Sequence, residues 1–248
     1  MTYKYIRVET ADHTRTITFA RPEVRNAFNN AMYFEVAEAI ENASADSDVH
    51  VIVLTGEGEF FCAGQDLSEL KMPKEGTELG FPKLLIQLQK NRKPMIAAVN
   101  GSGLGLGLTM LLHTDINVVA ESARFRLPFV TLAVVPEAAS SYLLPKIFGA
   151  QRAAEILYTA RWMEAAELKE VGLALDVVST EDVLPRAMEL AGRIAAMPPL
   201  AVQKTRELTR EPYEAEIFQA LHREGEAFRE RLGSPEQLAA VEKFFQRK

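Results

Sequence analysis

The sequence predicts a mixed α/β protein with a parallel sheet, followed by a mostly helical C-terminal region. Two features indicate this fold. Nearly unbroken apolar runs, VHVIVLTG at 49–56 and MIAAVN at 95–100, are typical of strands that are buried on both faces. Helical patterns alternate with such runs as far as about Phe129, which favours a parallel sheet, and helical patterns dominate after Ser140.

Local patterns predict the individual elements in chain order. Two β-rich segments at 5–10 and 14–19, joined by ADH, indicate a hairpin, and Asn29 or Asn30 is a suitable cap for a helix that runs to about Ala45. The central part is expected to contain strands at 49–56, 95–100, 115–120 and 123–127, a helix at 83–90, a glycine loop at 101–107 and a helix that begins at Leu108. The C-terminal part is expected to contain helices at 142–159, 164–171, 181–197, 201–210, from 214 onward and at 235–245, with one strand at 173–178.

Composition and charge restrict the classes of function. The chain has 248 residues, 48% hydrophobic and 25% charged, which allows one large domain or two small ones with a full core. The net charge of −6 comes from interleaved acids and bases, without the basic run expected for nucleic-acid or membrane binding. The single cysteine excludes an internal disulfide. We find no signal peptide, no membrane-spanning run and no peroxisomal address in the FFQRK end, so we expect a cytoplasmic protein.

A single acid, Glu137, lies among apolar and small residues in VVPEAASSYLLPKIF at 134–148. The ordinary interpretation is an acid at a helix N-terminus, where the macrodipole favours it and Pro136 fits as well. The functional interpretation is a buried carboxylate whose pKa is raised for proton transfer. The ordinary interpretation is the default when this pattern is taken alone.

Two further segments have the form of site loops. NGSGLGLGLTM at 100–110 either packs closely at its small residues or presents backbone N–H groups to a developing negative charge, and it matches no nucleotide-binding fingerprint. FFCAGQDL at 60–67 follows a buried strand, at the sheet edge where α/β proteins bind ligands. Cys62 is more typical of inert filler than of a nucleophile. The scattered histidines, His13, His50, His113 and His222, have no metal-binding spacing.

Three segments together resemble the crotonase, or enoyl-CoA hydratase/isomerase, superfamily in their order and spacing. They are RPEVRNAFN at 21–29, FFCAGQDL at 60–67 and AAVNGSGLGLGL at 97–108, and the resemblance covers nearly the whole chain. It implies a crotonase-type spiral of repeated ββα units at 1–195, with a helical trimerisation region at 196–248. It also implies an acyl-CoA thioester substrate and a homotrimer or dimer of trimers. No metal, nucleic acid, membrane partner or separate cofactor is expected, since coenzyme A is part of the substrate.

The resemblance also implies roles for particular residues. By position, the backbone amides of Gln65 and Leu106 form an oxyanion hole for the thioester. Ala63, Asp66 and Leu67 fall where the family contacts the adenine and pantetheine of coenzyme A. Arg25 falls near the coenzyme A phosphates, so these residues and Gln65 form the expected binding set.

Two departures from the family pattern concern acids. Hydratases of this family carry one catalytic glutamate after the glycine loop and a second after the proline of an F-x-x-P-E segment; Thr109 and Phe129 occupy these positions here. PEAASSYLLPKIFG at 136–149 instead resembles the segment of Δ3,Δ2-enoyl-CoA isomerases that carries their single catalytic base. The resemblance therefore favours a 3-enoyl-CoA to 2-enoyl-CoA isomerase with Glu137 as base.

Two classes of alternative remain open. The first is other crotonase-family chemistry on a CoA thioester, such as hydration, hydrolysis, decarboxylation or cyclic-diene isomerisation. The second is a non-catalytic acyl-CoA-binding protein. A mobile surface loop is expected at 68–82, and together with Phe81, Leu84 and Leu88 it is expected to shape the acyl pocket.

Overall fold

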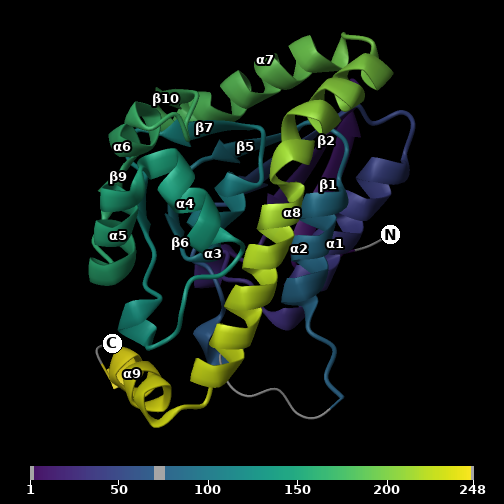
Figure 1. Cartoon of the computed structure of the whole chain (residues 1–248). Helices are drawn as coiled ribbons and strands as arrows, with labels where there is room; N and C mark the ends of the chain where they lie inside the picture. The colour runs from purple at the N-terminus through teal and green to yellow at the C-terminus, as the bar shows by residue number, and fades with distance from the viewer. Residues whose placement is uncertain (1–2, 70–75, 247–248) are drawn as a thin grey trace.

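Two sheets form the centre of the computed structural model, which describes residues 3–69 and 76–246 (Figure 1). The larger sheet has the order β1 (Ile6–Ala11), β2 (Thr14–Phe19), β3 (Val51–Gly56), β5 (Met95–Val99), β7 (Ile116–Ala120) and β10 (Asp176–Val178). The β1–β2 pairing is antiparallel, and the other pairings in this sheet are parallel. The smaller sheet has the order β4 (Phe60–Cys62), β6 (Ser102–Leu104), β8 (Arg124–Arg126) and β9 (Met163–Glu164), parallel except for β8–β9.

Successive strands alternate between the two sheets, which produces a spiral. β3, β5 and β7 go to the larger sheet, and the strand that follows each of them goes to the smaller one. Helices α2 (Gly80–Lys90) and α3 (Leu106–Thr109) follow the first two of these strand pairs. The expected repeat of ββα units is therefore confirmed. Because β4, β6 and β8 are parallel neighbours, the segments that leave their carboxyl ends lie at one edge of the smaller sheet.

The apolar runs become the buried strands. Every residue of β5 is buried, as are all residues of β3 except its last, Gly56. Helix α7 (Val183–Ala195) packs against β3, β5 and β7, and α1 (Asn30–Ala45) packs against α2. The predicted cap of α1 is also confirmed, since the Asn29 side chain accepts a hydrogen bond from the Met32 N–H.

The glycine-rich segments and the helix after Ser140 differ from the sequence prediction. The short strands β4 and β6 lie within segments that were expected to be a turn and a loop. The helix expected at 142–159 is divided into α4 (Ser140–Phe148) and α5 (Ala150–Thr159), because Gly149 adopts φ 79° and ψ 152°. The remaining elements are α6 (Ala165–Glu170), α9 (Pro235–Gln246) and the 3₁₀ turns η1 (Pro22–Val24), η2 (Leu67–Glu69), η3 (Met110–Leu112), η4 (Val130–Leu132) and η5 (Thr180–Asp182).

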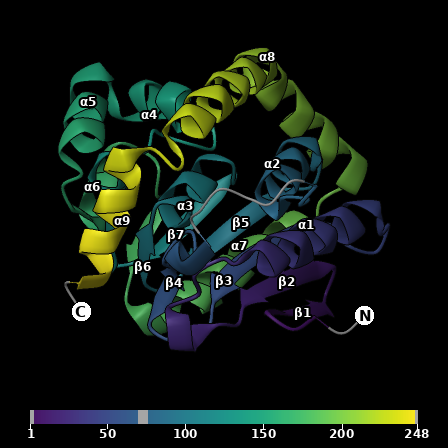
Figure 2. The same cartoon turned by 90° about the horizontal axis from the view of Figure 1, so that it is seen from below.

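Helix α8 (Pro199–Arg231) corrects a second prediction. Two helices separated at Pro212 were expected, but one helix runs through the proline. Proline removes one backbone hydrogen bond from a helix interior. Contacts on both sides offset this loss: Arg206 pairs with Asp115 before the proline, and Ile217 is buried after it. Figure 1 shows α8 crossing the molecule with α4 on one side and α2 on the other, and α8 packs against α4, beside which it also lies in Figure 2.

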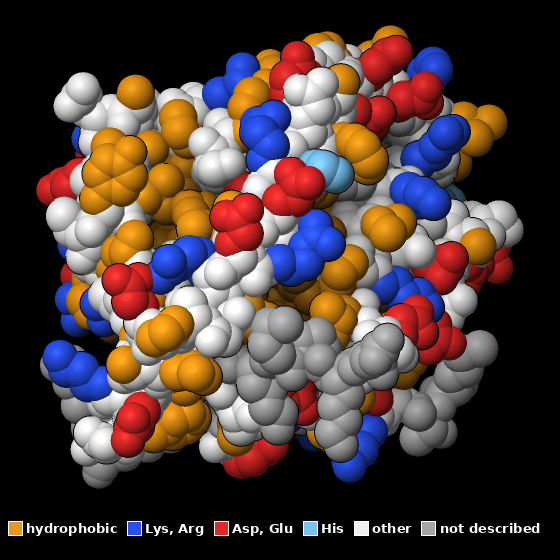
Figure 3. Space-filling model, turned by 60° about the horizontal axis from the view of Figure 1, so that its bottom comes forward, with side chains coloured by type: hydrophobic (Ala, Val, Ile, Leu, Met, Phe, Trp, Pro, Cys, Tyr) orange, Lys and Arg blue, Asp and Glu red, His pale blue; other side chains and the backbone are white. Residues whose placement is uncertain are grey.

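The surface carries charges of both signs. Figure 3 shows acidic and basic side chains interspersed with hydrophobic ones over one face. No helix within 3–69 and 76–246 has the length and apolar character needed to cross a membrane. The domain division at 195–196, the trimer and the cytoplasmic location stay predictions. Part of the loop expected at 68–82 lies outside the described residues, and α2 already begins at Gly80.

Candidate active site

Two turns that follow neighbouring strands bring the Gln65 and Leu106 backbones together. Cys62 of β4 pairs with Gly103 of β6, and Gln65 and Leu106 lie at equal distances along the chain beyond that pair. Gly64 lies directly against the second turn, since a Cβ atom placed on it would be 3.6 Å from the Leu106 nitrogen. Parallel register therefore brings the segments that carry Gln65 and Leu106 next to each other. That their two amides form an oxyanion hole stays a prediction.

Both amides are held in place without a hydrogen-bond acceptor among the described residues. Around Gln65, the Phe28 N–H donates to the Gly64 carbonyl oxygen at 2.8 Å, and the Asp66 N–H donates to the Phe28 carbonyl oxygen at 2.9 Å. Leu106 begins α3, where first-turn N–H groups have no acceptor within the helix. Backbone N–H groups without acceptors are the kind of donor that can stabilise a developing oxyanion.

The glycine loop packs against neighbouring backbone. A Cβ atom on Gly101 would overlap the Glu59 carbonyl oxygen, and one on Gly107 would overlap the Cys62 carbonyl oxygen. One on Gly103 would lie 2.6 Å from the Gly107 carbonyl oxygen. The close-packing interpretation of this loop is therefore confirmed at three positions, and this packing also fixes the Leu106 amide.

The Glu137 carboxylate reaches Thr109 at the end of α3. Thr109 Oγ1 donates a hydrogen bond to Glu137 Oε1 at 2.6 Å. Glu137 is partly exposed as a residue, but its Oε2 is buried and has no hydrogen-bond partner among the described residues. Burial raises the pKa of Glu137 to about 8; the Thr109 hydrogen bond opposes the rise and the Glu224 carboxylate adds to it. A buried carboxylate with one free oxygen can take and return a proton near neutral pH.

The ordinary interpretation of Glu137 as a helix-start acid is wrong. Helix α4 begins at Ser140, and another carboxylate, that of Glu224 from α8, binds the N–H groups of the N-cap residue Ala139 and of Ser141. Glu224 accepts from the Ala139 N–H at 2.7 Å and from the Ser141 N–H at 2.8 Å. The Glu137 side chain therefore has no capping role, because its hydrogen bond goes to Thr109.

Thr109 and Phe129 occupy the two positions expected to hold acids in hydratases. Thr109 lies beside the Glu137 carboxylate, and Phe129 lies in the core. Thr109 is fully buried and bonds to Glu137, so the first position remains in the site as a hydroxyl. Phe129 is 5% exposed and belongs to the hydrophobic core. Tyr33 is a further polar residue here: its hydroxyl donates to Gln65 Oε1 at 2.8 Å, and burial raises its pKa, so the phenol is neutral.

The residues expected to bind coenzyme A lie on two segments that a backbone hydrogen bond joins. The Ala63 N–H donates to the Arg25 carbonyl oxygen at 3.0 Å, which joins the segments at 21–29 and 60–67. Arg25 is exposed, and its guanidinium lies over the Phe60 ring at 5.0 Å from the ring centroid. The Asp66 carboxylate pairs with Arg21 at 3.2 Å, and Leu67 begins η2. Their contacts with coenzyme A stay predictions.

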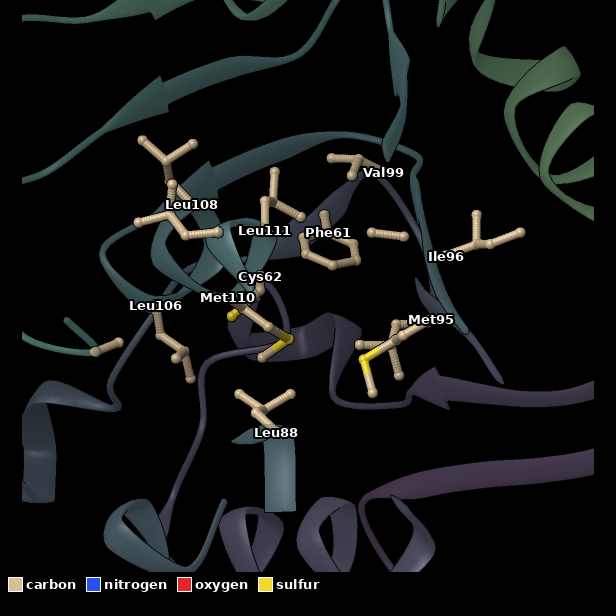
Figure 4. Close-up of a cluster of buried hydrophobic side chains, with 14 of the residues drawn as sticks. Phe61, Cys62, Leu88, Met95, Ile96, Val99, Leu106, Leu108, Met110 and Leu111 are labelled. Carbon is tan, nitrogen blue, oxygen red and sulfur yellow. The ribbon is translucent and has the colours of Figure 1, made fainter. Parts of the chain in front are cut away.

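Cys62 has the surroundings of a structural residue. It lies in the buried apolar cluster of Figure 4 with Phe61, Met110 and Leu111. Burial raises the pKa of its thiol to about 12, which keeps the thiolate scarce at neutral pH. No cluster of three His, Cys, Asp or Glu side chains within the described ranges could hold a metal ion.

Sequence reasoning missed Glu224, Tyr33 and the role of His113. Glu224 lies in LHREGEAF, where charged residues surround it and no local pattern marks the one that is buried. Its importance depends on a contact between α8 and α4, which are far apart in the chain. His113 was grouped with the histidines that lack metal-binding spacing, as a structural or surface residue, and it is buried with both ring nitrogens bonded.

Known proteins resemble this chain over most of its length. The family model described as enoyl-CoA hydratase/isomerase matches residues 9–247. The chain is 32% identical over 234 residues to a 2,3-dehydroadipyl-CoA hydratase of Escherichia coli (strain K12), covering 94% of this chain and 92% of that protein. It is 35% identical over 191 residues to a 1,2-epoxyphenylacetyl-CoA isomerase of the same organism, covering 74% and 73%. An enoyl-CoA hydratase/isomerase structure from Pseudoalteromonas atlantica T6c has a TM-score of 0.95 at 33% identity, covering 99% and 98%.

Proposed function

The chain belongs to the enoyl-CoA hydratase/isomerase family, and we propose that it is an isomerase that moves the double bond of a 3-enoyl-CoA to the 2-position. Glu137 is the single base in this proposal, and the Gln65 and Leu106 amides bind the thioester oxygen. The proposal depends on one observation: the carboxylate in this site bonds to the Thr109 hydroxyl, at the position where a second acid would lie.

One carboxylate is sufficient for the proton transfers of this reaction. The thioester makes the C2 proton acidic, and Glu137 removes it to form a dienolate. The dienolate oxygen accepts hydrogen bonds from the two backbone amides, each worth about 3 kcal/mol in the transition state. The same carboxylic acid then delivers the proton to C4, which restores the carboxylate and leaves the 2-enoyl thioester. Both carbons must therefore face Glu137 from the same side of the acyl chain.

The environment of Glu137 suits a base that works near neutral pH. Its pKa of about 8 makes the carboxylate a stronger base than an exposed glutamate, while about a tenth of it is ionised at pH 7. The Thr109 hydroxyl stabilises the ionised form, and the unpartnered Oε2 is the oxygen available to a substrate proton. We expect the isomerisation rate to rise with pH through about 8.

Hydration of a 2-enoyl-CoA is the second candidate, because a similar Escherichia coli protein is named a hydratase. Hydration needs one group to activate water and another to deliver a proton. The other buried carboxylate nearby, Glu224, uses both oxygens to bind backbone N–H groups. The Phe129 ring cannot transfer a proton, so the site supports isomerisation better than hydration.

A direct assay of both reactions tests the proposal. A 3-enoyl-CoA is supplied and the absorbance of the conjugated 2-enoyl thioester is followed, with loss of that absorbance from a 2-enoyl-CoA in water as the parallel test. We expect isomerisation without hydration, and a loss of at least about 100-fold in the Glu137→Gln variant. Glu230→Gln is the matched control, because Glu230 is an exposed glutamate on α8.

The other outcomes assign other functions. Full isomerase activity in Glu137→Gln contradicts the single-base proposal. Hydration that depends on Glu137 moves the assignment to a hydratase. Binding of a CoA thioester without turnover, unchanged in Glu137→Gln, supports the non-catalytic binding protein.

A further inference from the structure

Two consecutive alanines directly after Glu137 adopt a left-handed backbone conformation. Ala138 and Ala139 both have φ of 56°. Residues with a Cβ atom rarely adopt this conformation, because the Cβ approaches a carbonyl oxygen. Such a conformation persists only where surrounding contacts hold it. Both alanines are buried, and two buried polar side chains bind their backbone groups.

Glu224 holds the second alanine. Its side chain comes from α8 and the residue is 6% exposed. One carboxylate oxygen accepts the Ala139 N–H and the other accepts the Ser141 N–H, at 2.7 and 2.8 Å. A bidentate contact of this kind fixes the start of α4 and the direction in which the chain enters it.

His113 holds the first alanine. Its Nε2 lies 2.8 Å from the Ala138 carbonyl oxygen, and its Nδ1 lies 2.7 Å from Nε2 of Gln89 in α2. A carbonyl oxygen can only accept, so Nε2 of the imidazole carries the proton and Nδ1 accepts from the Gln89 amide. Burial lowers the pKa of His113 to about 4, so the ring is neutral at pH 7.

We propose that Glu224 and His113 are positioning residues that hold the Ala138–Ala139 pair in its left-handed conformation and thereby aim the Glu137 carboxylate at Thr109 and the reacting carbons. The inference rests on the proposed function, in which Glu137 is the base. It assigns a role to α8, which supplies Glu224 to the Ala139 backbone 85 positions earlier in the chain. Neither residue touches the substrate in this proposal, and each acts through the backbone that carries Glu137.

Glu224 also has an electrostatic effect that a purely structural residue would lack. Its carboxylate is the charged side chain that faces Glu137; the other groups near Glu137 are the Thr109 hydroxyl, the Tyr33 phenol and the Cys62 thiol, which are neutral. Arg223 lies near Glu224 on α8. Removing the negative charge of Glu224 should therefore lower the pKa of Glu137, since like charge disfavours its ionised form.

The test separates orientation from charge with two variants. Glu224→Gln keeps the size of the side chain but removes the charge and one acceptor; Glu230→Gln is the control on the same helix. We expect kcat for isomerisation to fall about tenfold with KM changed less than about threefold, and the acidic limb of the pH–rate profile to move to lower pH. Adding Ala139→Gly should restore most of kcat, because glycine adopts positive φ without support, while the shifted limb remains.

A readout that needs no turnover distinguishes failure of this inference from failure of the proposed function. The C=O band of protonated Glu137, identified by its loss in Glu137→Gln, is titrated by difference infrared spectroscopy in wild type and in Glu224→Gln. A lower midpoint in Glu224→Gln supports the inference even if a 3-enoyl-CoA is not the substrate. An unchanged midpoint, or a kcat loss that Ala139→Gly does not reduce, overturns it. If Glu224→Gln does not fold, two variants of His113 are compared instead. His113→Gln keeps a hydrogen-bond donor for the Ala138 carbonyl oxygen, and His113→Leu does not. Equal kcat in these two variants overturns the role of His113.

Discussion

The two halves of the candidate site are built in different ways. The half that would bind the thioester oxygen consists of backbone N–H groups at Gln65 and Leu106, placed by strand register and by glycines that touch backbone. The other half is the Glu137 side chain, placed by a strained turn and by buried polar contacts. Backbone N–H groups are present whatever side chain a position carries, proline excepted. The first half should therefore tolerate side-chain changes but not changes in packing, whereas the second half depends on the identity of single residues.

The largest expected effect is on the backbone half, from a change in packing. In Gly107→Ala the added methyl group would overlap the Cys62 carbonyl oxygen, and neither backbone can move without displacing β4 or α3. We expect a loss of about 4 kcal/mol or more in the free energy of unfolding, with loss of CoA-thioester binding. Urea unfolding and thioester binding measure the two effects.

Gly192→Ala is the matched control for this change. Gly192 lies in α7, is exposed, and a Cβ atom there would meet no atom within 4 Å. Alanine is a better helix former than glycine, so this variant should gain about 1 kcal/mol. Equal stability of the two variants would refute the packing role of the glycine loop.

An effect of comparable size, spread over several pH units, is expected on the carboxylate half as a pH dependence of stability. The pKa of Glu137 is about 8 in the folded protein, against its ordinary value of 4.5 in the unfolded chain. Between pH 4.5 and pH 8 the folded state therefore holds a proton that the unfolded state has released. This proton stabilises the folded state fully below pH 4.5. The stabilisation then falls by about 1.4 kcal/mol for each pH unit and is lost as the pH rises through 8. Glu137→Gln should flatten this decline.

Urea unfolding at pH 5, 7 and 9 and at one protein concentration measures the decline. Glu224, whose pKa burial also raises, should leave part of the slope in Glu137→Gln. His113 has the opposite effect on the pH dependence of stability. Its pKa is lowered in the folded protein, so it destabilises the fold only as the pH falls below its ordinary pKa of 6.5. A parallel pH dependence of wild type and Glu137→Gln would mean that the Glu137 carboxyl is solvated in solution.

The same contrast explains how much could be predicted from the sequence. The backbone half could be anticipated, because apolar runs predict the strands and because closely spaced glycines mark where backbone meets backbone. The identity of Glu137 was also visible, since it is the one acid in an apolar segment. Its supports were not visible: Glu224 and His113 reach it through folding of distant segments, and a charged helix pattern does not mark a buried glutamate. The continuity of α8 through Pro212 likewise depends on tertiary contacts.

A third prediction concerns the hydrogen bond between the two halves, from α3 to Glu137. Thr109→Val removes the hydroxyl that stabilises ionised Glu137 and keeps nearly the same side-chain volume. The pKa of Glu137 should rise, the acidic limb of the pH–rate profile should move to higher pH, and kcat at pH 7 should fall about tenfold. Thr109→Ser keeps the donor and should stay close to wild type. If the acidic limb of the pH–rate profile moved in the same direction in Thr109→Val as in Glu224→Gln, the opposite effects on the Glu137 pKa assigned to these two contacts would be contradicted.

The smallest effect is expected from a side-chain change at a backbone-built position. Gln65→Ala keeps the main-chain N–H and its supports at Phe28, and removes only the side-chain bond to the Tyr33 hydroxyl. We expect kcat to change less than about threefold and the free energy of unfolding to change by about 1 kcal/mol or less. Tyr33→Phe removes the same hydrogen bond from the donor side. We expect its kcat and its free energy of unfolding to agree with those of Gln65→Ala within these limits. A large kcat loss in Gln65→Ala alone, with unchanged stability, would show that the Gln65 amide group itself binds the acyl chain, because the main-chain donor and the fold would both be intact.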